Sequence, residues 1–167
     1  GWIVSHKKVK KRFSAAIQII DLHSSSLSQW IIERFIANGG LAAHIPRICR
    51  EYSIKRDVMV SALSKYAPEG MTWYKPRGGY YIWCRLPASV SAARLIPKAA
   101  ERRVVFVPGT PFFPAGQGDD FIRLNFTFAT AKDIEEGIKR LCEAVKELKG
   151  CSEKPEGYTV LEISPIT

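Results

Sequence analysis

The sequence predicts an α+β fold, a short sheet covered by helices, over residues 69–148. Two observations carry this prediction. Apolar residues alternate with a period of two in four short runs, as in half-buried strands. In the segments between and after these runs, apolar residues recur at three- and four-residue steps, as on one face of a helix. The resulting order, strand–strand–helix–strand–strand–helix, is typical of helices packed against one small sheet.

The first 40 residues predict a strand at 2–5, a basic polar stretch through Phe13, and a helix from Ser14 to Asn38. The serine run at 24–26 is expected to interrupt this helix, with one serine capping its second part. Asn38-Gly39-Gly40 is a stop signal. These residues have the pattern of part of a larger domain.

The longest predicted helix covers residues 41–68 and links the first segment to the sheet. Its apolar residues fall on one stripe: Leu41, Ile45, Ile48, Tyr52, Met59, Leu63 and Tyr66. Pro46 is expected in the first turn, where a missing N–H costs no hydrogen bond.

The remaining elements follow at short intervals. They are strands at 71–74 and 80–86, a helix at about 91–102 that contains Pro97, strands at 104–107 and 121–126, and a helix from Thr130. Asp133 stands where a capping box has its acidic residue. From residue 149 the composition turns polar, so 149–167 is expected to be a tail.

Composition bounds the function. The chain has 167 residues, 46% hydrophobic, with 25 Lys+Arg against 16 Asp+Glu and a net charge of +9. No apolar run approaches the roughly 18 residues that a membrane span needs, and no signal peptide is evident. We therefore expect a cytoplasmic protein with no membrane partner.

The cysteines and histidines predict no metal site. Neither residue type has the spacing of metal ligands: Cys49, Cys84, Cys142 and Cys151, and His6, His23 and His44. Reduced cysteines buried as small apolar residues are the expectation.

The start of the chain predicts a segment of a longer protein. It opens Gly-Trp-Ile-Val with no methionine, directly in an apolar run. Chain termini are usually polar and frayed, so such a start is unusual for a complete domain.

Arg123 is the candidate binding residue. In the strand at 121–126, alternation places Ile122, Leu124 and Phe126 on the core face, and Arg123 between Phe121 and Asn125 on the other. A guanidinium there suits a carboxylate, because its planar fork binds both oxygens. On pattern alone, an exposed arginine paired with Asp119 or Asp120 is the favoured alternative.

The basic run from His6 to Arg12 could contact phosphates, although such runs are more often solvated. Lys7, Lys8 and Lys10 could each be proposed as a Schiff-base lysine. Nothing in the sequence around them supplies the apolar pocket that lowers a lysine pKa.

Three motifs in register resemble a known family. They are Arg77-Gly78-Gly79-Tyr80-Tyr81-Ile82-Trp83, Val105-Phe106-Val107-Pro108-Gly109-Thr110-Pro111-Phe112-Phe113 and Phe121-Ile122-Arg123-Leu124-Asn125-Phe126. From Gly1 to about Leu148 the chain resembles the C-terminal half of fold-type I, pyridoxal-phosphate-dependent aminotransferases. The branch is the 2-aminoadipate/kynurenine type, which also supplies the effector domain of MocR-type GntR regulators.

The resemblance implies a division of the chain. Residues 1–40 would belong to the large cofactor-binding domain, which is α/β in the parent protein. Residues 41–68 would be an interdomain helix and residues 69–148 the small C-terminal domain. Gly1-Trp2 matches the end of the family motif that carries the Schiff-base lysine and the phosphate-binding arginine. The segment would then contain no catalytic and no cofactor-binding residue.

Arg123 aligns with the family's arginine for the substrate α-carboxylate, and the resemblance now favours that role. Two departures affect local geometry. The family often has glycine where Arg103 stands, at a helix end that favours left-handed backbone, and Pro97 is unusual inside a helix.

The resemblance implies that the parent is a homodimeric aminotransferase using pyridoxal 5'-phosphate, an L-α-amino acid and a 2-oxo acid. The segment alone would be inactive and would expose apolar surface, with Trp2, Ile3 and Trp30 as candidates. The alternative is the effector-binding domain of a MocR-type regulator, whose whole protein would also bind nucleic acid. A stand-alone nucleic-acid-binding module, driven by the positive charge, is the weakest reading.

Overall fold

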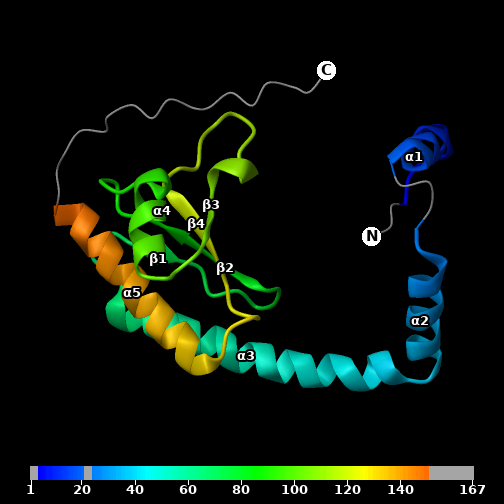
Figure 1. Ribbon diagram of the computed structural model, residues 1–167, viewed down its shortest axis with the longest axis horizontal. Coiled ribbons are helices and arrows are strands. Elements are labelled where there is room, and N and C mark those ends of the chain that lie inside the picture. Colours follow the sequence, from blue (N-terminus) through cyan, green and yellow to red (C-terminus); the bar gives the residue numbers. More distant parts are fainter. Residues whose placement is uncertain (1–3, 21–23, 151–167) are drawn as a thin grey trace. The chain divides into compact units, whose positions relative to one another are not determined.

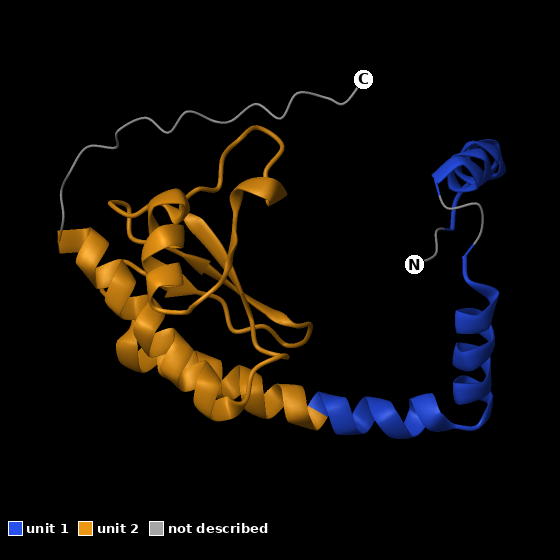
Figure 2. Ribbon diagram, viewed as in Figure 1, with its two compact units in different colours: residues 1–49 blue, residues 50–167 orange. Residues whose placement is uncertain are grey.

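The computed structural model describes residues 4–20 and 24–150 (Figure 1). The chain divides into two compact units, residues 1–49 and residues 50–167, shown in separate colours in Figure 2. The elements in order are α1 (Lys7–Ile20), α2 (Ser26–Ala37), α3 (Gly40–Tyr66), β1 (Thr72–Trp73), β2 (Tyr81–Arg85), α4 (Ala92–Glu101), β3 (Val107–Pro108), the 3-10 turn η1 (Thr110–Phe112), β4 (Phe121–Asn125) and α5 (Ala131–Gly150).

In the described residues of the first unit, all regular structure is helical. The predicted helix start at Ser14 is wrong, because α1 begins at Lys7 and includes the basic residues from Lys7 to Arg12. Lysine and arginine are good helix formers, and no glycine or proline interrupts them. Of the predicted strand at 2–5, residues 2 and 3 lie outside the described residues, and Val4 and Ser5 are not in a strand.

The break at the serine run is confirmed. Ser25 caps α2 by accepting a hydrogen bond from the backbone N–H of Ser28 at 3.3 Å. The chain then turns through Gly39, whose φ is 75°, and α3 starts at once at Gly40. Pro46 therefore lies inside α3, in its second turn, and its expected place in the first turn is wrong.

The second unit contains a four-stranded sheet in the order β1-β2-β4-β3, with every pair antiparallel. One face is buried: Ile82, Cys84, Ile122 and Leu124 are at most 4% exposed. They pack with buried residues of α3, α4 and α5, including Leu63, Leu95, Leu141 and Val145. Figure 1 shows these three helices with the sheet, and an α+β fold is confirmed.

The third strand is shorter than predicted, at Val107–Pro108 rather than 104–107. The reason lies at the end of α4. The N–H of Arg103 donates to the carbonyl of Ala100 at 2.9 Å, and the N–H of Val104 donates to that of Ala99 at 2.9 Å. This pair of bonds is a Schellman motif, which uses Val104 to close the helix.

The last helix begins as predicted. Thr130 Oγ1 accepts from the N–H of Asp133 at 3.2 Å and donates to the Asp133 carboxylate at 2.6 Å. None of the helices within 4–20 and 24–150 combines the length and hydropathy that crossing a bilayer requires.

The cysteines only partly follow the expectation. Cys84 and Cys142 are reduced and buried, but Cys49 is exposed, and Cys151 lies outside the described residues. Within the described ranges, no group of three or more His, Cys, Asp and Glu residues is placed to hold a metal ion.

Candidate functional site: an arginine on the open face of the sheet

The sheet face opposite the core carries Arg123. Trp83 of β2 stands directly across from Arg123 on one side, and Val107 of β3 on the other. Directly paired residues of neighbouring strands point to the same face, so these side chains lie together. The alternation predicted for β4 is confirmed, since Ile122 and Leu124 are buried on the other face.

The guanidinium of Arg123 contacts aromatic rings instead of acidic groups. Its Cζ lies 4.1 Å from the ring centroid of Tyr81 and 4.6 Å from that of Phe112. Its Nε is buried and has no hydrogen-bond partner within the described part of the chain. A buried polar nitrogen without a partner is costly, and such an atom calls for an explanation.

A cluster of aromatic side chains borders this arginine. The ring of Trp83 meets Phe112 edge-on at 5.5 Å and stacks on Phe121 at 5.5 Å. Phe113 stacks in turn on Phe121 at 5.6 Å. The open face therefore presents the Arg123 guanidinium among aromatic rings, whereas Arg85 on the same face pairs with Asp120 at 2.8 Å.

The acidic residues nearest in sequence are committed elsewhere. Asp120 pairs with Arg85 at 2.8 Å. The Asp119 carboxylate accepts from the N–H of Ala93 at 3.0 Å, in the first turn of α4. Neither pairs with Arg123, so the alternative of an arginine neutralised by Asp119 or Asp120 is wrong.

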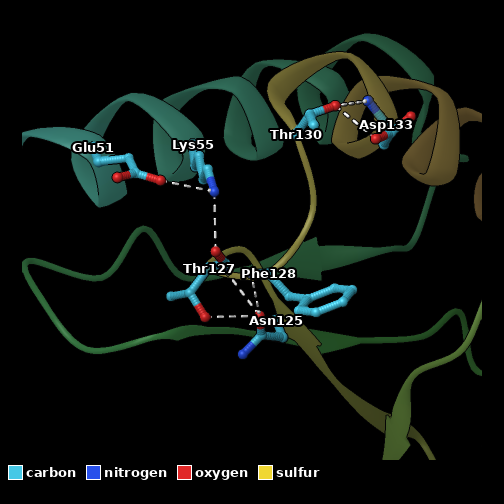
Figure 3. Close-up of polar contacts among 7 residues, drawn as sticks. All are labelled: Glu51, Lys55, Asn125, Thr127, Phe128, Thr130 and Asp133. Atoms are coloured by element: carbon cyan, nitrogen blue, oxygen red, sulfur yellow. Dashed lines mark hydrogen bonds and ion pairs between the residues drawn. The ribbon is translucent and has the colours of Figure 1, made fainter. Parts of the chain in front are cut away.

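The turn after β4 is fastened to α3, as Figure 3 shows. The Asn125 side-chain oxygen accepts from the N–H groups of Thr127 and Phe128, at 2.9 and 3.2 Å. Lys55 donates to the carbonyl of Thr127 at 3.0 Å and pairs with Glu51 at 3.1 Å. These contacts fix the end of the strand that carries Arg123.

Three described lysines were candidates for forming a Schiff base with a carbonyl cofactor. Lys7, Lys8 and Lys10 are exposed on α1, and the half-buried Lys55 is held by Glu51. A hydrogen bond to Glu147 raises the pKa of Lys98, which favours its charged form. A lysine that forms a Schiff base with a carbonyl cofactor needs a lowered pKa, so Lys98 does not suit that role.

The other sequence candidates are exposed. The basic run is exposed, and its residues from Lys7 to Arg12 lie on α1, which has no buried residue. Trp30 on α2 is 70% exposed, as expected, whereas Trp2 and Ile3 lie outside the described residues. The sequence indicated Arg123 as a candidate, but it did not indicate the contacts of this residue with Tyr81 and Phe112. Tyr81 and Phe112 lie in two of the motifs that predicted the family. It is the register of β2 against β4 and the position of η1 that bring their rings to the guanidinium.

The chain is similar to proteins of one family. The profile of the family "Aminotransferase class I and II" matches residues 1–141. Aromatic-amino-acid aminotransferase 1 of Thermococcus litoralis is 37% identical over 147 residues, which cover 88% of this chain and 35% of that protein. The uncharacterized HTH-type transcriptional regulator YdfD of Bacillus subtilis is 30% identical over 148 residues, covering 89% of this chain and 30% of that protein.

A solved structure gives the same result. The crystal structure of LysN, the α-aminoadipate aminotransferase of Thermus thermophilus, superimposes with a TM-score of 0.81 at 33% identity. The match covers 88% of this chain and 38% of that one, which was solved in complex with N-(5'-phosphopyridoxyl)-L-leucine. The chain thus spans about a third of the length of these proteins.

Proposed function

Because the chain belongs to the class I and II aminotransferase family, we propose that the protein containing it transfers an amino group between an L-α-amino acid and a 2-oxo acid. The cofactor would be pyridoxal 5'-phosphate, and the active protein a homodimer. When bound, the cofactor supplies the electron sink for the reaction at the substrate Cα. The observation that carries the proposal is Arg123, an unneutralised cation on the open sheet face.

The role of Arg123 in this proposal is to bind and orient the substrate carboxylate. Because Nε is buried, the two terminal nitrogens are the ones that a carboxylate reaches. A bidentate pair with them fixes the direction of the substrate and hence of its Cα–H bond. Proton movement at that bond would use a lysine of the parent protein that these 167 residues do not contain. These 167 residues would then be inactive alone.

The domain assignment is part of the same proposal. Residues 1–40 would complete a larger cofactor-binding domain, 41–68 would form the interdomain helix, and 69–148 the small domain. The apolar residues exposed on α1 and α2, such as Ile20 and Trp30, support this assignment. Helix faces of this kind are stable when another element covers them.

The test uses the complete reading frame that contains these residues, with its cofactor bound. We expect a yellow protein whose visible absorbance falls with an L-amino acid and recovers with 2-oxoglutarate. The panel is L-phenylalanine, L-leucine, L-glutamate and L-2-aminoadipate. A colourless protein, or a yellow one that reacts with none of the four, would contradict the proposal.

The first variant to compare is Arg123→Ala in the same full-length protein. Losing two charge-assisted hydrogen bonds should weaken amino acid binding on the order of 100-fold. The yellow colour should remain, because Arg123 is proposed to bind the substrate and not the cofactor. Unchanged half-reaction kinetics with the best amino acid would disprove the role of Arg123, and Arg85→Ala is the matched control on the same face.

The second candidate is an effector-binding domain of a MocR-type regulator, favoured by the similarity to YdfD. If the protein containing this chain is such a regulator, Arg123 would bind an amino acid without turnover. A yellow protein that binds amino acid, transfers no amino group and carries a DNA-binding segment would decide for the regulator.

A further inference from the structure

We propose that Tyr81 and Phe112 are positioning residues for Arg123, whose rings hold the guanidinium in place of a carboxylate and so leave its terminal N–H groups for the substrate. The inference rests on the proposed function, because it takes the substrate carboxylate as the partner of Arg123. It adds two residues that act through that arginine.

The contacts support this assignment directly. Both ring centroids lie within 5 Å of the Arg123 Cζ, inside the roughly 6 Å over which a cation is attracted to an aromatic face. No hydrogen bond or ion pair to the Arg123 side chain occurs within residues 4–20 and 24–150. In this part of the chain the aromatic rings are therefore what fixes the long, rotamer-rich side chain.

Rings suit this task better than an acidic residue does. A carboxylate would occupy the same N–H groups as the substrate and neutralise their charge. An aromatic ring attracts the cation through its face, whereas the hydrogen bonds of guanidinium lie in its plane. Arg123 is thus held without losing the donors that bind a carboxylate.

The two rings are themselves supported from separate elements. Tyr81 lies in β2 and pairs with Asn125 of β4, next to the strand position of Arg123. Phe112 closes η1, where its N–H donates to the carbonyl of Gly109 at 2.9 Å, and its ring meets Trp83 edge-on. Gly109 is tied to β4 through a 2.8 Å hydrogen bond to Phe121.

The experiment measures single-turnover bleaching of the full-length, cofactor-loaded protein by the fastest L-amino acid of the panel above. Tyr81→Leu and Phe112→Leu should each raise the apparent dissociation constant about 2- to 30-fold, the range that one cation–π contact implies. The maximal bleaching rate should change less than the dissociation constant. Tyr81→Phe, which keeps the ring, should bind nearly as the unaltered protein does.

Two controls separate positioning from a general packing defect. Tyr74→Leu removes an exposed tyrosine that contacts no cation in the described chain, and it should leave binding unchanged. The carboxamide of the same amino acid lacks the charged group, so its affinity should be equal in all ring variants and in the unaltered protein. Tyr81 and Phe112 are 40% and 47% exposed, so their truncation spares the core.

A double-mutant cycle gives the sharpest readout. In an Arg123→Ala background, Phe112→Leu should cause no further loss of amino acid affinity. Equal losses in both backgrounds, or equal losses for acid and carboxamide, would overturn the inference.

If Arg123→Ala itself leaves amino acid binding unchanged, the proposed function fails. If Arg123→Ala weakens binding and neither ring variant does, the positioning role alone fails. Phe112→Met replaces Phe112→Leu if the latter lowers the melting temperature.

Discussion

At the scale of single residues, two core thiols show how surroundings decide chemistry. Burial raises the pKa of Cys84 to about 12, with a smaller contribution from Cys142. Burial also raises the pKa of Cys142 to about 11, against an opposing effect of Lys146. A nucleophilic cysteine needs a lowered pKa, so both are structural.

These thiols predict alkaline sensitivity of the fold. In the unfolded chain a thiol ionises near pH 9, whereas the buried thiols stay protonated. The native state then binds more protons than the unfolded state above pH 9. The contribution of the two buried thiols to the free energy of unfolding is therefore fully present below pH 9. It is lost as the pH rises through about 11 and 12.

Cys84→Ala should make this decline shallower, because it removes the larger shift. Urea unfolding between pH 8 and pH 11 measures it, as the slope of the unfolding free energy against pH. Cys49→Ala, at an exposed position, is the matched control and should keep the original slope. Identical slopes for all three proteins would count against the effect.

At the scale of elements, α4 keeps its helical form despite two unfavourable residues. Pro97 lies inside it and lacks the N–H for one helix bond. Arg103, which follows its C-cap, has a φ of 59° and is the one non-glycine residue with positive φ in the described chain. This is the left-handed position where the family resemblance led us to expect glycine.

Arg103→Gly should stabilise the fold by about 0.5–1 kcal/mol. Glycine removes the free-energy cost of the left-handed backbone, about 1–2 kcal/mol. Part of this gain is offset, because glycine also increases the conformational entropy of the unfolded chain. Chemical denaturation of the protein and the variant measures the difference. Arg102→Gly, where φ is −94°, is the control and should be destabilising. A loss of stability in Arg103→Gly would contradict the argument.

At the scale of the whole molecule, the core belongs to one unit only. Among the described residues, every buried apolar side chain lies between Met59 and Leu148. In the described part of residues 1–49 no residue is buried, and α1 and α2 expose many large apolar side chains. The second unit therefore has a hydrophobic core of its own, whereas the described part of the first unit has none.

Residues 50–150 should fold as an independent unit. Thermal unfolding followed by circular dichroism should be cooperative, because the sheet, α4 and α5 share one closed core. Leu141→Ala, at a fully buried position, should cost about 2–5 kcal/mol. Val105→Ala, at a 91% exposed position, should cost little. A gradual, non-cooperative transition would refute this prediction.

The sequence by itself determined the element types between residues 69 and 148 and the two faces of β4. The tail predicted from residue 149 is wrong for Lys149 and Gly150, which belong to α5, and residues 151–167 lie outside the described residues. Alternation and helical periodicity are local properties, and burial of the apolar face enforces them. It also determined the cap at Thr130 and a cap at one of the three serines 24–26, which the structure identifies as Ser25; both side chains bond within three residues. The family followed from three motifs in register.

Only the tertiary structure decided what surrounds Arg123. Its contacts come from β2 and η1, segments separated from it in the chain, so no local pattern encodes them. The same holds for Asp119 and Asp120, whose partners lie in the first turn of α4 and on β2. A strand's periodicity fixes which face a side chain occupies. The pairing register and the packing of the loops fix its neighbours, and those neighbours decide whether an arginine is neutralised or available.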